Sequence, residues 1–235
     1  MSSLKTTHRW AVAQQNPELE KELSAGLGIP GLVARIMVAH GISSIEEGQL
    51  FLTPSLDRDW ADPLIIPGMS VVADRVERAI RDHEHIAVFG DFDVDGITST
   101  CLLTEALHTF GADVTPCIPH RFDEGYVLSR AARDRVIELA HPQLIVTVDN
   151  GIAAKEEVSY LESLGIDLVV TDHHEPSDQV PQGVPLTDPK LENEGPSREL
   201  AGAGVALKLV QVLGGRLGKP SYWRSLIEVA ALGTV

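Results

Sequence analysis

Apolar residues are spaced differently in the first 70 residues and in the rest of the chain. Residues 32–38 place apolar side chains at helical spacing, and three prolines between residues 54 and 67 then interrupt the pattern. A second helical pattern follows at Val72, Val76 and Ile80. We therefore expect a helical N-terminal region over residues 1–70 and a second domain over residues 71–235.

Beyond residue 80, short apolar runs alternate with segments long enough for a helix. The runs are His85–Phe89, Val114–Ile118, Leu144–Val148 and Asp167–Val170. The segments between them are Ile97–Phe110, Ser129–Ala140 and Ala153–Leu164. Parallel strands joined by right-handed helical crossovers are the economical topology for this alternation. The sequence thus predicts an α/β fold with a doubly wound, mostly parallel sheet flanked by helices.

Carboxylates follow three of the four predicted strands. The first strand leads into Asp91, Asp93 and Asp95, the third into Asp149, and the fourth into the triplet Asp172-His173-His174. In an open α/β sheet, ligands bind beyond the carboxyl ends of the strands. We expect these acids, distant in sequence, to converge there.

Three acids within five residues repel one another, and a cation relieves that repulsion. In an extended or looped segment Asp91, Asp93 and Asp95 would point to one side, and Gly96 would permit a sharp turn into the next helix. Carboxylates suit Mg²⁺ or Mn²⁺, and an added imidazole favours Mn²⁺. So many acids indicate two ions, the usual arrangement for in-line phosphoryl chemistry.

Other interpretations of these residues must be weighed. An EF-hand loop is excluded because its twelfth position would be Leu102, which lies in an apolar helix. Thr98 or Asp95 could instead cap the following helix. Adjacent histidines point to opposite faces, so at most one of His173 and His174 easily becomes a ligand, and the other could meet a substrate phosphate.

Two further segments carry weaker signals. In residues 120–126, His120 and Arg121 could bind a phosphate while Phe122 or Tyr126 stacks on a base, and a plain surface loop is an equal alternative. Residues 201–204, Ala-Gly-Ala-Gly, could present backbone amides to an anion. Close packing at a helix start explains these glycines better.

Composition narrows the class of protein. The 235 residues are 43% hydrophobic and 23% charged, an ordinary globular balance, and the two cysteines support neither a disulfide framework nor a cysteine zinc site. The polar start is unlike a signal peptide and no apolar stretch is long enough for a membrane span, so we expect a cytoplasmic protein without a membrane partner. The net charge of −15 argues against an extended basic surface for nucleic acid, although bound cations would cancel part of it.

Three ordered blocks resemble the first three motifs of the DHH phosphoesterase superfamily. They are GDFDVDGITST at 90–100, VTVDNGI at 146–152 and TDHHEP at 171–176. The segments IPHRFDEGY at 118–126 and AGAGVALKL at 201–209 are similar to those of the RecJ family of single-strand-specific exonucleases. The resemblance extends over essentially the whole chain.

The resemblance implies a role for each motif residue. Asp91, Asp93 and Asp95 would share two Mn²⁺ or Mg²⁺ ions, Asp149 would bridge the ions, and His173 would be a further ligand. His174 and Arg121 would contact the scissile phosphate. Asp172 would orient the two histidines. The reaction would be hydrolysis of terminal phosphodiesters of single-stranded DNA, 5′ to 3′, with release of mononucleotides in DNA repair and recombination. Single-strand-binding protein is the partner that this implies.

Two alternatives to an exonuclease stay open. One is a DHH hydrolase of small phosphates such as pyrophosphate, short oligonucleotides or cyclic dinucleotides. The other is a non-catalytic DHH scaffold, although every acid of the first three motifs is present.

The chain departs from the family pattern in two places. Val127 stands where the family usually has glycine, and the chain ends at Val235, just before the aspartate of the fourth motif. We therefore expect the N-terminal portion of a longer protein, weakly active or inactive alone.

Overall fold

The computed structural model describes residues 14–120, 128–192 and 194–235. The described residues form two compact units that divide between Trp60 and Ala61, before the boundary expected at residue 70. No helix in the described residues is long and apolar enough to cross a membrane.

The described part of the first unit consists of short helices, two of which have side-chain N-caps. They are α1 (Pro17–Leu27), α2 (Gly31–Ala39), α3 (Ile45–Leu52) and α4 (Leu56–Asp59). Ser44 caps α3 by accepting a hydrogen bond from the Glu47 amide, and Asn16 caps α1 in the same way. The predicted helical pattern at residues 32–38 is α2, where Ala34 and Met37 are buried and Ile36 is exposed.

The second unit is built on a five-stranded sheet in which every pairing is parallel. Its strands are β1 (His85–Phe89), β2 (Asp113–Cys117), β3 (Leu144–Val148), β4 (Asp167–Thr171) and β5 (Leu186–Thr187), in the order β2-β1-β3-β4-β5. The central strand β3 is buried at all five positions. The parallel pairing and this strand order confirm the predicted doubly wound α/β fold.

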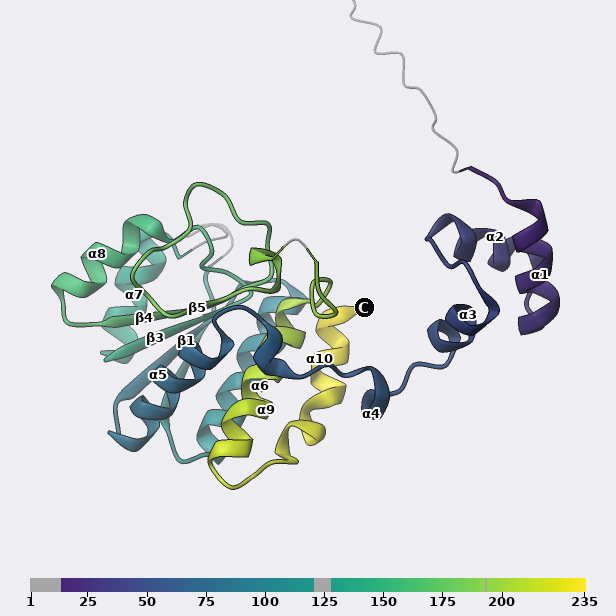
Figure 1. Cartoon of the computed structure of the whole chain (residues 1–235). Helices are drawn as coiled ribbons and strands as arrows, with labels where there is room; N and C mark the ends of the chain where they lie inside the picture. Colours follow the sequence, from purple (N-terminus) through teal and green to yellow (C-terminus); the bar gives the residue numbers. More distant parts are fainter. Residues whose placement is uncertain (1–13, 121–127, 193) are drawn as a thin grey trace, which may run out of the picture. The chain divides into compact units, whose positions relative to one another are not determined.

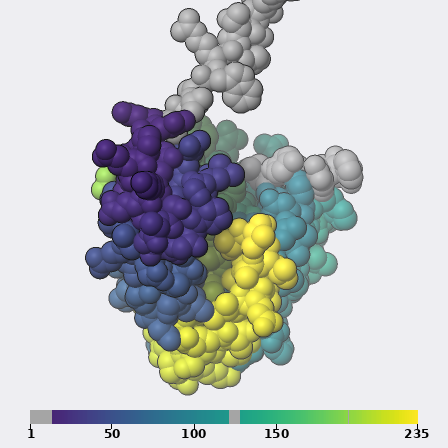
Figure 2. Space-filling model, turned by 90° about the vertical axis from the view of Figure 1, so that its right-hand side faces the viewer, coloured from purple at the N-terminus to yellow at the C-terminus, as the bar shows by residue number. Residues whose placement is uncertain are grey.

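Helices cover both faces of the sheet. The α-helices are α5 (Met69–Arg81), α6 (Val94–Thr109), α7 (Arg130–Ala140), α8 (Lys155–Ser163), α9 (Gly202–Arg216) and α10 (Ile227–Thr234). Figure 1 shows α7 and α8 on one face and α5, α6, α9 and α10 on the other. Phe89, Val136, Leu161 and Val170 belong to the core under α7 and α8. The yellow α10 packs against α6 and α9 and lies at the surface in Figure 2.

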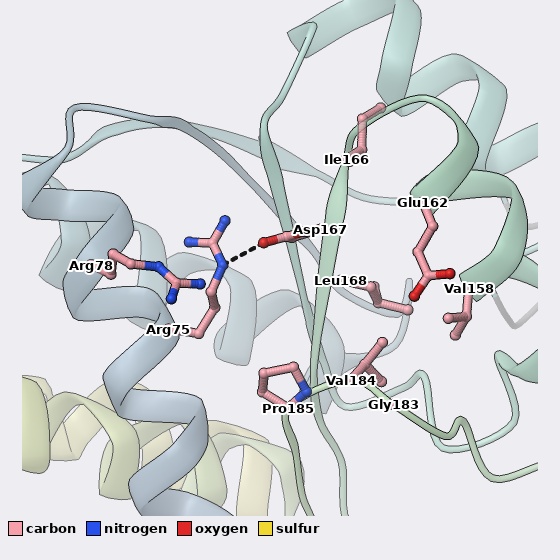
Figure 3. Close-up of a pocket in the computed structure, with 10 residues that line it drawn as sticks. All are labelled: Arg75, Arg78, Val158, Glu162, Ile166, Asp167, Leu168, Gly183, Val184 and Pro185. Atoms are coloured by element: carbon pink, nitrogen blue, oxygen red, sulfur yellow. Dashed lines mark hydrogen bonds and ion pairs between the residues drawn. The ribbon is translucent and has the colours of Figure 1, made fainter.

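A buried arginine joins α5 to the amino end of β4. Arg75 is 6% exposed, and it pairs with Asp167 at 2.7 Å and with Glu84, just before β1, at 2.6 Å. Figure 3 shows this arginine beside a pocket of about 230 Å³ that Leu168 and Val184 also line. The ion pairs fix α5 against the sheet at the edge opposite the carboxyl ends of the strands.

Candidate metal centre

The first acidic motif spans the turn from β1 into α6, and its three acids have different local roles. Asp91 follows the strand and is buried. Asp93 is the N-cap of α6, because its Oδ1 accepts a hydrogen bond from the Gly96 amide at 2.9 Å. Asp95 lies in the first helical turn. The expected alternation along an extended or looped segment is therefore wrong, since the helix begins within the motif. The cap is Asp93 rather than Thr98 or Asp95.

Asp95 is held by the first turn of α9. Its Oδ2 and Oδ1 accept hydrogen bonds from the amides of Gly202 and Ala203, both at 2.7 Å. The Ala-Gly-Ala-Gly segment thus does present amides to an anion, and that anion is a carboxylate of this chain. Gly202 also serves close packing, because a Cβ added there would lie 2.6 Å from the Cβ of Asp149.

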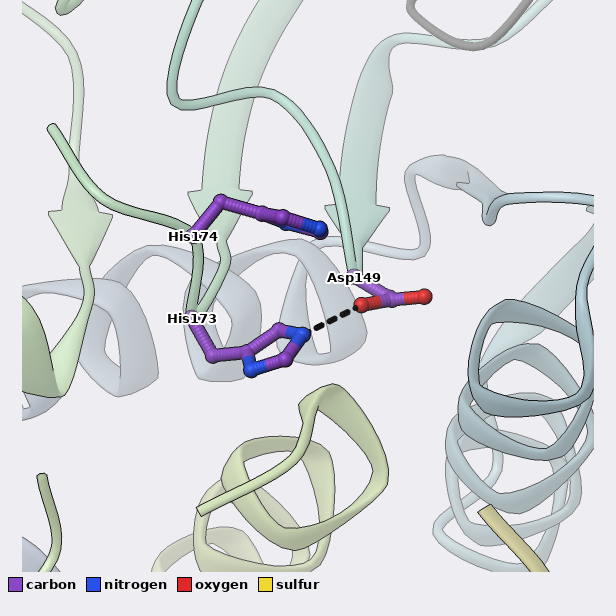
Figure 4. Close-up of side chains that lie close together, drawn as sticks. All are labelled: Asp149, His173 and His174. Carbon is purple, nitrogen blue, oxygen red and sulfur yellow. Dashed lines mark ion pairs between the residues drawn. The ribbon is translucent and has the colours of Figure 1, made fainter. Parts of the chain in front are cut away.

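Asp149 follows β3 in a left-handed backbone conformation, with φ of 58°, and is 2% exposed. Its Oδ1 lies 2.9 Å from Nε2 of His173, which comes from the segment after β4 (Figure 4). The same Nε2 lies 3.4 Å from Oδ2 of Asp95. Groups from the ends of β1, β3 and β4 therefore meet, beside the β1/β3 point where this strand order reverses direction and where such sheets bind ligands.

Negative charge is concentrated and poorly solvated at this meeting point. Burial and the neighbouring charges of Asp95 and Asp93 raise the pKa of Asp149 to about 7, against the opposing effect of His173. Burial also raises the pKa of Asp91, and the charge of Asp93 adds to the effect. Burial lowers the pKa of His173, but its contact with Asp149 outweighs this and the pKa is raised. A bound cation would offset this repulsion.

Asp172 is a buried anchor for the histidine pair. It is 1% exposed, and it accepts hydrogen bonds from the Ile152 amide at 2.8 Å, the His173 amide at 2.7 Å and the His174 ring Nδ1 at 2.7 Å. Burial opposes its ionisation, but these bonds prevail and lower its pKa. The Asp172 hydrogen bond raises the pKa of His174 to about 9. The side chain of His174 is 56% exposed.

Residues 85–234 match the N-terminal domain of the DHH family, which is well over half of the chain. The chain belongs to the DHH family. Curated relatives include the single-stranded-DNA-specific exonuclease RecJ of Bacillus subtilis, 39% identical over 97% of this chain and 28% of the relative. The RecJ of Escherichia coli is 34% identical over 93% of this chain and 39% of the relative. This DHH chain thus spans about a third of the length of these relatives.

Solved structures extend the comparison of this DHH chain. The exonuclease RecJ bound to manganese is 36% identical, with a TM-score of 0.67, over 74% of this chain and 44% of that one. RecJ from Thermus thermophilus in complex with Mn²⁺ is 30% identical, with a TM-score of 0.70, over 95% of this chain and 31% of that one. These likenesses confirm the resemblance to RecJ that the sequence motifs carried.

The donor set of this DHH chain fits a divalent cation. Asp149, His173 and His174 each offer a ligand atom, and the three atoms lie within 4.8 Å of one another. Carboxylate oxygens with one or two imidazoles suit Mn²⁺. This set of possible ligands includes His174, for which the family resemblance implied contact with the scissile phosphate instead. Arg121 lies outside the described residues, so its assignment stays a prediction.

Asp188 is a buried acid that the sequence analysis did not single out. It follows β5, is fully buried and caps the turn η2 (Pro189–Leu191), while its Oδ2 has no hydrogen-bond partner. Burial raises its pKa to about 6, and it senses the charges of Asp172 and His173. The rule that acids follow strands would have found it, but β5 has only two residues and gives no apolar run.

Proposed function

We propose that this chain carries the metal-binding part of a RecJ-type exonuclease. The reaction is hydrolysis of terminal phosphodiesters of single-stranded DNA, 5′ to 3′, with release of mononucleotides in DNA repair and recombination. The RecJ relatives, named as single-stranded-DNA-specific exonucleases, support the substrate. RecJ structures with Mn²⁺ and with Mg²⁺ support the choice of ion.

One observation carries this proposal: Asp149 and Asp95 converge on a single nitrogen of His173, at 2.9 and 3.4 Å. In our proposal Asp91, Asp93, Asp95, Asp149 and His173 hold two ions. When bound, such ions lower the pKa of water and neutralise a transferring phosphoryl group. The chain then needs no covalent nucleophile of its own.

The remaining side chains position the phosphate. Asp172 binds Nδ1 of His174 and raises the pKa of that ring, which favours a protonated Nε2 that would donate to a phosphate oxygen. Arg121 would contact the same phosphate. Because Asp172 also binds the amides of residues 152 and 173, it ties the ends of β3 and β4 together.

The test is release of nucleotides from single-stranded DNA labelled at either end, with Mn²⁺ and with chelator. We would assay this chain alone and together with the part of the Bacillus subtilis relative that it does not match. Metal-dependent release from the 5′ end supports the proposal, with weak or no activity expected of the chain alone. Hydrolysis of pyrophosphate or cyclic dinucleotides in its place would overturn it.

Two further attributes follow from the proposed activity. A single-strand-binding protein is the proposed partner, because it would occupy the same substrate, and co-sedimentation on coated DNA would detect the complex. The cytoplasm is the proposed location, because chromosomal DNA is found there in the bacteria of the matched relatives.

A further inference from the structure

Beside the metal centre, two cations converge on one exposed carboxylate oxygen. Lys190 Nζ and Arg198 Nη2 lie 3.7 Å and 3.3 Å from the same atom, Oε1 of Glu175. Glu175 directly follows His174 in the chain, so the two Cα atoms are about 3.8 Å apart. The charge of Lys190 opposes the raised pKa of His174, so Lys190 lies within electrostatic reach of the group that faces the scissile phosphate in the proposed function.

The cations are fixed more firmly than the acid. The side chains of Lys190 and Arg198 are 20% and 27% exposed, whereas that of Glu175 is 69% exposed. Arg198 also donates from Nη1 to the Glu192 carbonyl at 3.4 Å. The backbone of Lys190 is held by its amide hydrogen bond to buried Asp188 at 2.7 Å. The backbone of Lys190 and the side chain of Arg198 thus have further contacts, whereas the more exposed Glu175 side chain pairs only with these two cations among the described residues.

Exposed ion pairs of this kind are weak and easily screened. A phosphate brings more charge and more acceptor oxygens than one carboxylate oxygen, and arginine and lysine both bind it well. In a chain with net charge −15, a polyanionic strand also needs local cations to approach an acidic centre.

We propose that Lys190 and Arg198 form a second phosphate site, which binds the DNA phosphate next to the scissile one, and that Glu175 occupies this site until the strand displaces it. This inference rests on the proposed function and specifies how the substrate backbone is bound. The inference predicts that substitutions at Glu175 and at its cationic partners change DNA affinity in opposite directions. Removing the charge of Glu175 leaves the phosphate site open, whereas removing a cation weakens the site.

The experiment measures binding of a short phosphorothioate oligo-dT, labelled at its 3′ end, by fluorescence anisotropy in Mn²⁺. The variants are Lys190→Ala with Arg198→Ala, and Glu175→Gln. The matched control is Arg78→Ala with Arg81→Ala, which removes the same charge at the far end of α5. Thermal unfolding of each variant reports any loss of structure.

We expect the Lys190/Arg198 double variant to bind roughly ten-fold more weakly than the control, the loss of about one charged hydrogen bond. Its affinity should also depend less steeply on salt, with a slope lower by roughly 0.7 for one lost phosphate. Glu175→Gln should bind several-fold more tightly than the wild type. Lys190→Ala alone should weaken binding, whereas Lys190→Arg, which keeps the positive charge, should bind about as tightly as the wild type.

If the double variant binds DNA like the control and only its Tm falls, Lys190 and Arg198 serve only to stabilise the structure and the inference is wrong. Weaker binding by Glu175→Gln would equally overturn it. Mn²⁺ binding by the wild type without any affinity for the oligonucleotide would instead overturn the proposed substrate, and the inference with it. The two failures are therefore distinguishable.

Discussion

Gly202 leaves no room for a side chain beside the acids of the candidate metal centre. An added Cβ would lie 2.6 Å from Cβ and 2.7 Å from Oδ1 of Asp149, while the Gly202 amide binds Asp95. We expect Gly202→Ala to displace both acids and to weaken Mn²⁺ affinity at least ten-fold, as measured by calorimetry. Gly215→Ala is the control, because it is in the same helix and has no atom within 4 Å of an added Cβ. Equal affinities in the two variants would refute the packing argument.

Lys208 supplies a pH-dependent test of a buried charge. It is 1% exposed on α9, its ammonium donates to the Ala61 carbonyl, and burial lowers its pKa to about 8. Between pH 8 and the ordinary pKa of 10.5, the unfolded chain keeps a proton that the folded chain has released. Stability attributable to this residue therefore rises with pH across that window.

We expect the free energy of unfolding of the wild type to gain roughly 1–2 kcal/mol relative to Lys208→Met between pH 7.5 and pH 9.5, at about 1.4 kcal/mol per pKa unit. Urea titrations at the two pH values measure the difference. Lys219→Met is the control, because that exposed ammonium also donates to a carbonyl, of Thr109, without being buried. A constant difference across the window would contradict the assignment.

The chemical types in the site were predictable residue by residue, but their contacts were not. Asp149 and His173 were expected to meet because both follow parallel strands, and they do at 2.9 Å. The hydrogen bonds of Asp95 join residues 107 and 108 positions apart. Short-range patterns hold no information on such a pairing, which depends on how α9 packs against α6.

Elements with a clear apolar period were predicted closely. The expected strands at His85–Phe89 and Leu144–Val148 match β1 and β3 at both ends. The helix expected from Ile97 begins at Val94, because Asp93 caps it and no apolar residue marks the cap. β5 has no run to detect, and its two residues are fixed by pairing with Val170 and Thr171 of β4.

Arg75 is the element-scale test, since it joins α5 to β4 and to the turn before β1. We expect Arg75→Met to lower the free energy of unfolding by about 1–3 kcal/mol, because Glu84 and Asp167 lose their partner. Partial exposure of Asp167 keeps the loss below that of a fully buried pair. Mn²⁺ affinity should not change, because these groups lie at the opposite edge of the sheet.

The control for this prediction is Arg81→Met, whose ion pair with Glu77 involves a side chain that is 67% exposed. That variant should lose less than about 1 kcal/mol in the same urea titration. An equal loss of unfolding free energy in the two variants would show that the buried ion pairs of Arg75 stabilise the fold no more than the surface pair of Arg81.

At the scale of the whole molecule, the excess of acids links metal binding to stability. The net charge is −15, and Asp91, Asp93, Asp95 and Asp149 add to it at one edge of the sheet. A cation that binds only the folded chain stabilises it by mass action, by about 2.7 kcal/mol at a concentration one hundred times its Kd. For a unit of this size, each kcal/mol raises the Tm by roughly 2–4 °C.

Saturating Mn²⁺ should therefore raise the Tm of the wild type by roughly 5–10 °C over its value in chelator. Asp149→Asn keeps the size of the side chain but removes the carboxylate at the centre of the site. Its Tm in chelator should therefore stay close to that of the wild type, and most of the increase in Tm caused by Mn²⁺ should disappear. Asp82→Asn, at the far end of α5, removes the same charge and should keep the full rise. Differential scanning calorimetry measures all three, and a full rise in Asp149→Asn would place the stabilising ion elsewhere on the molecule.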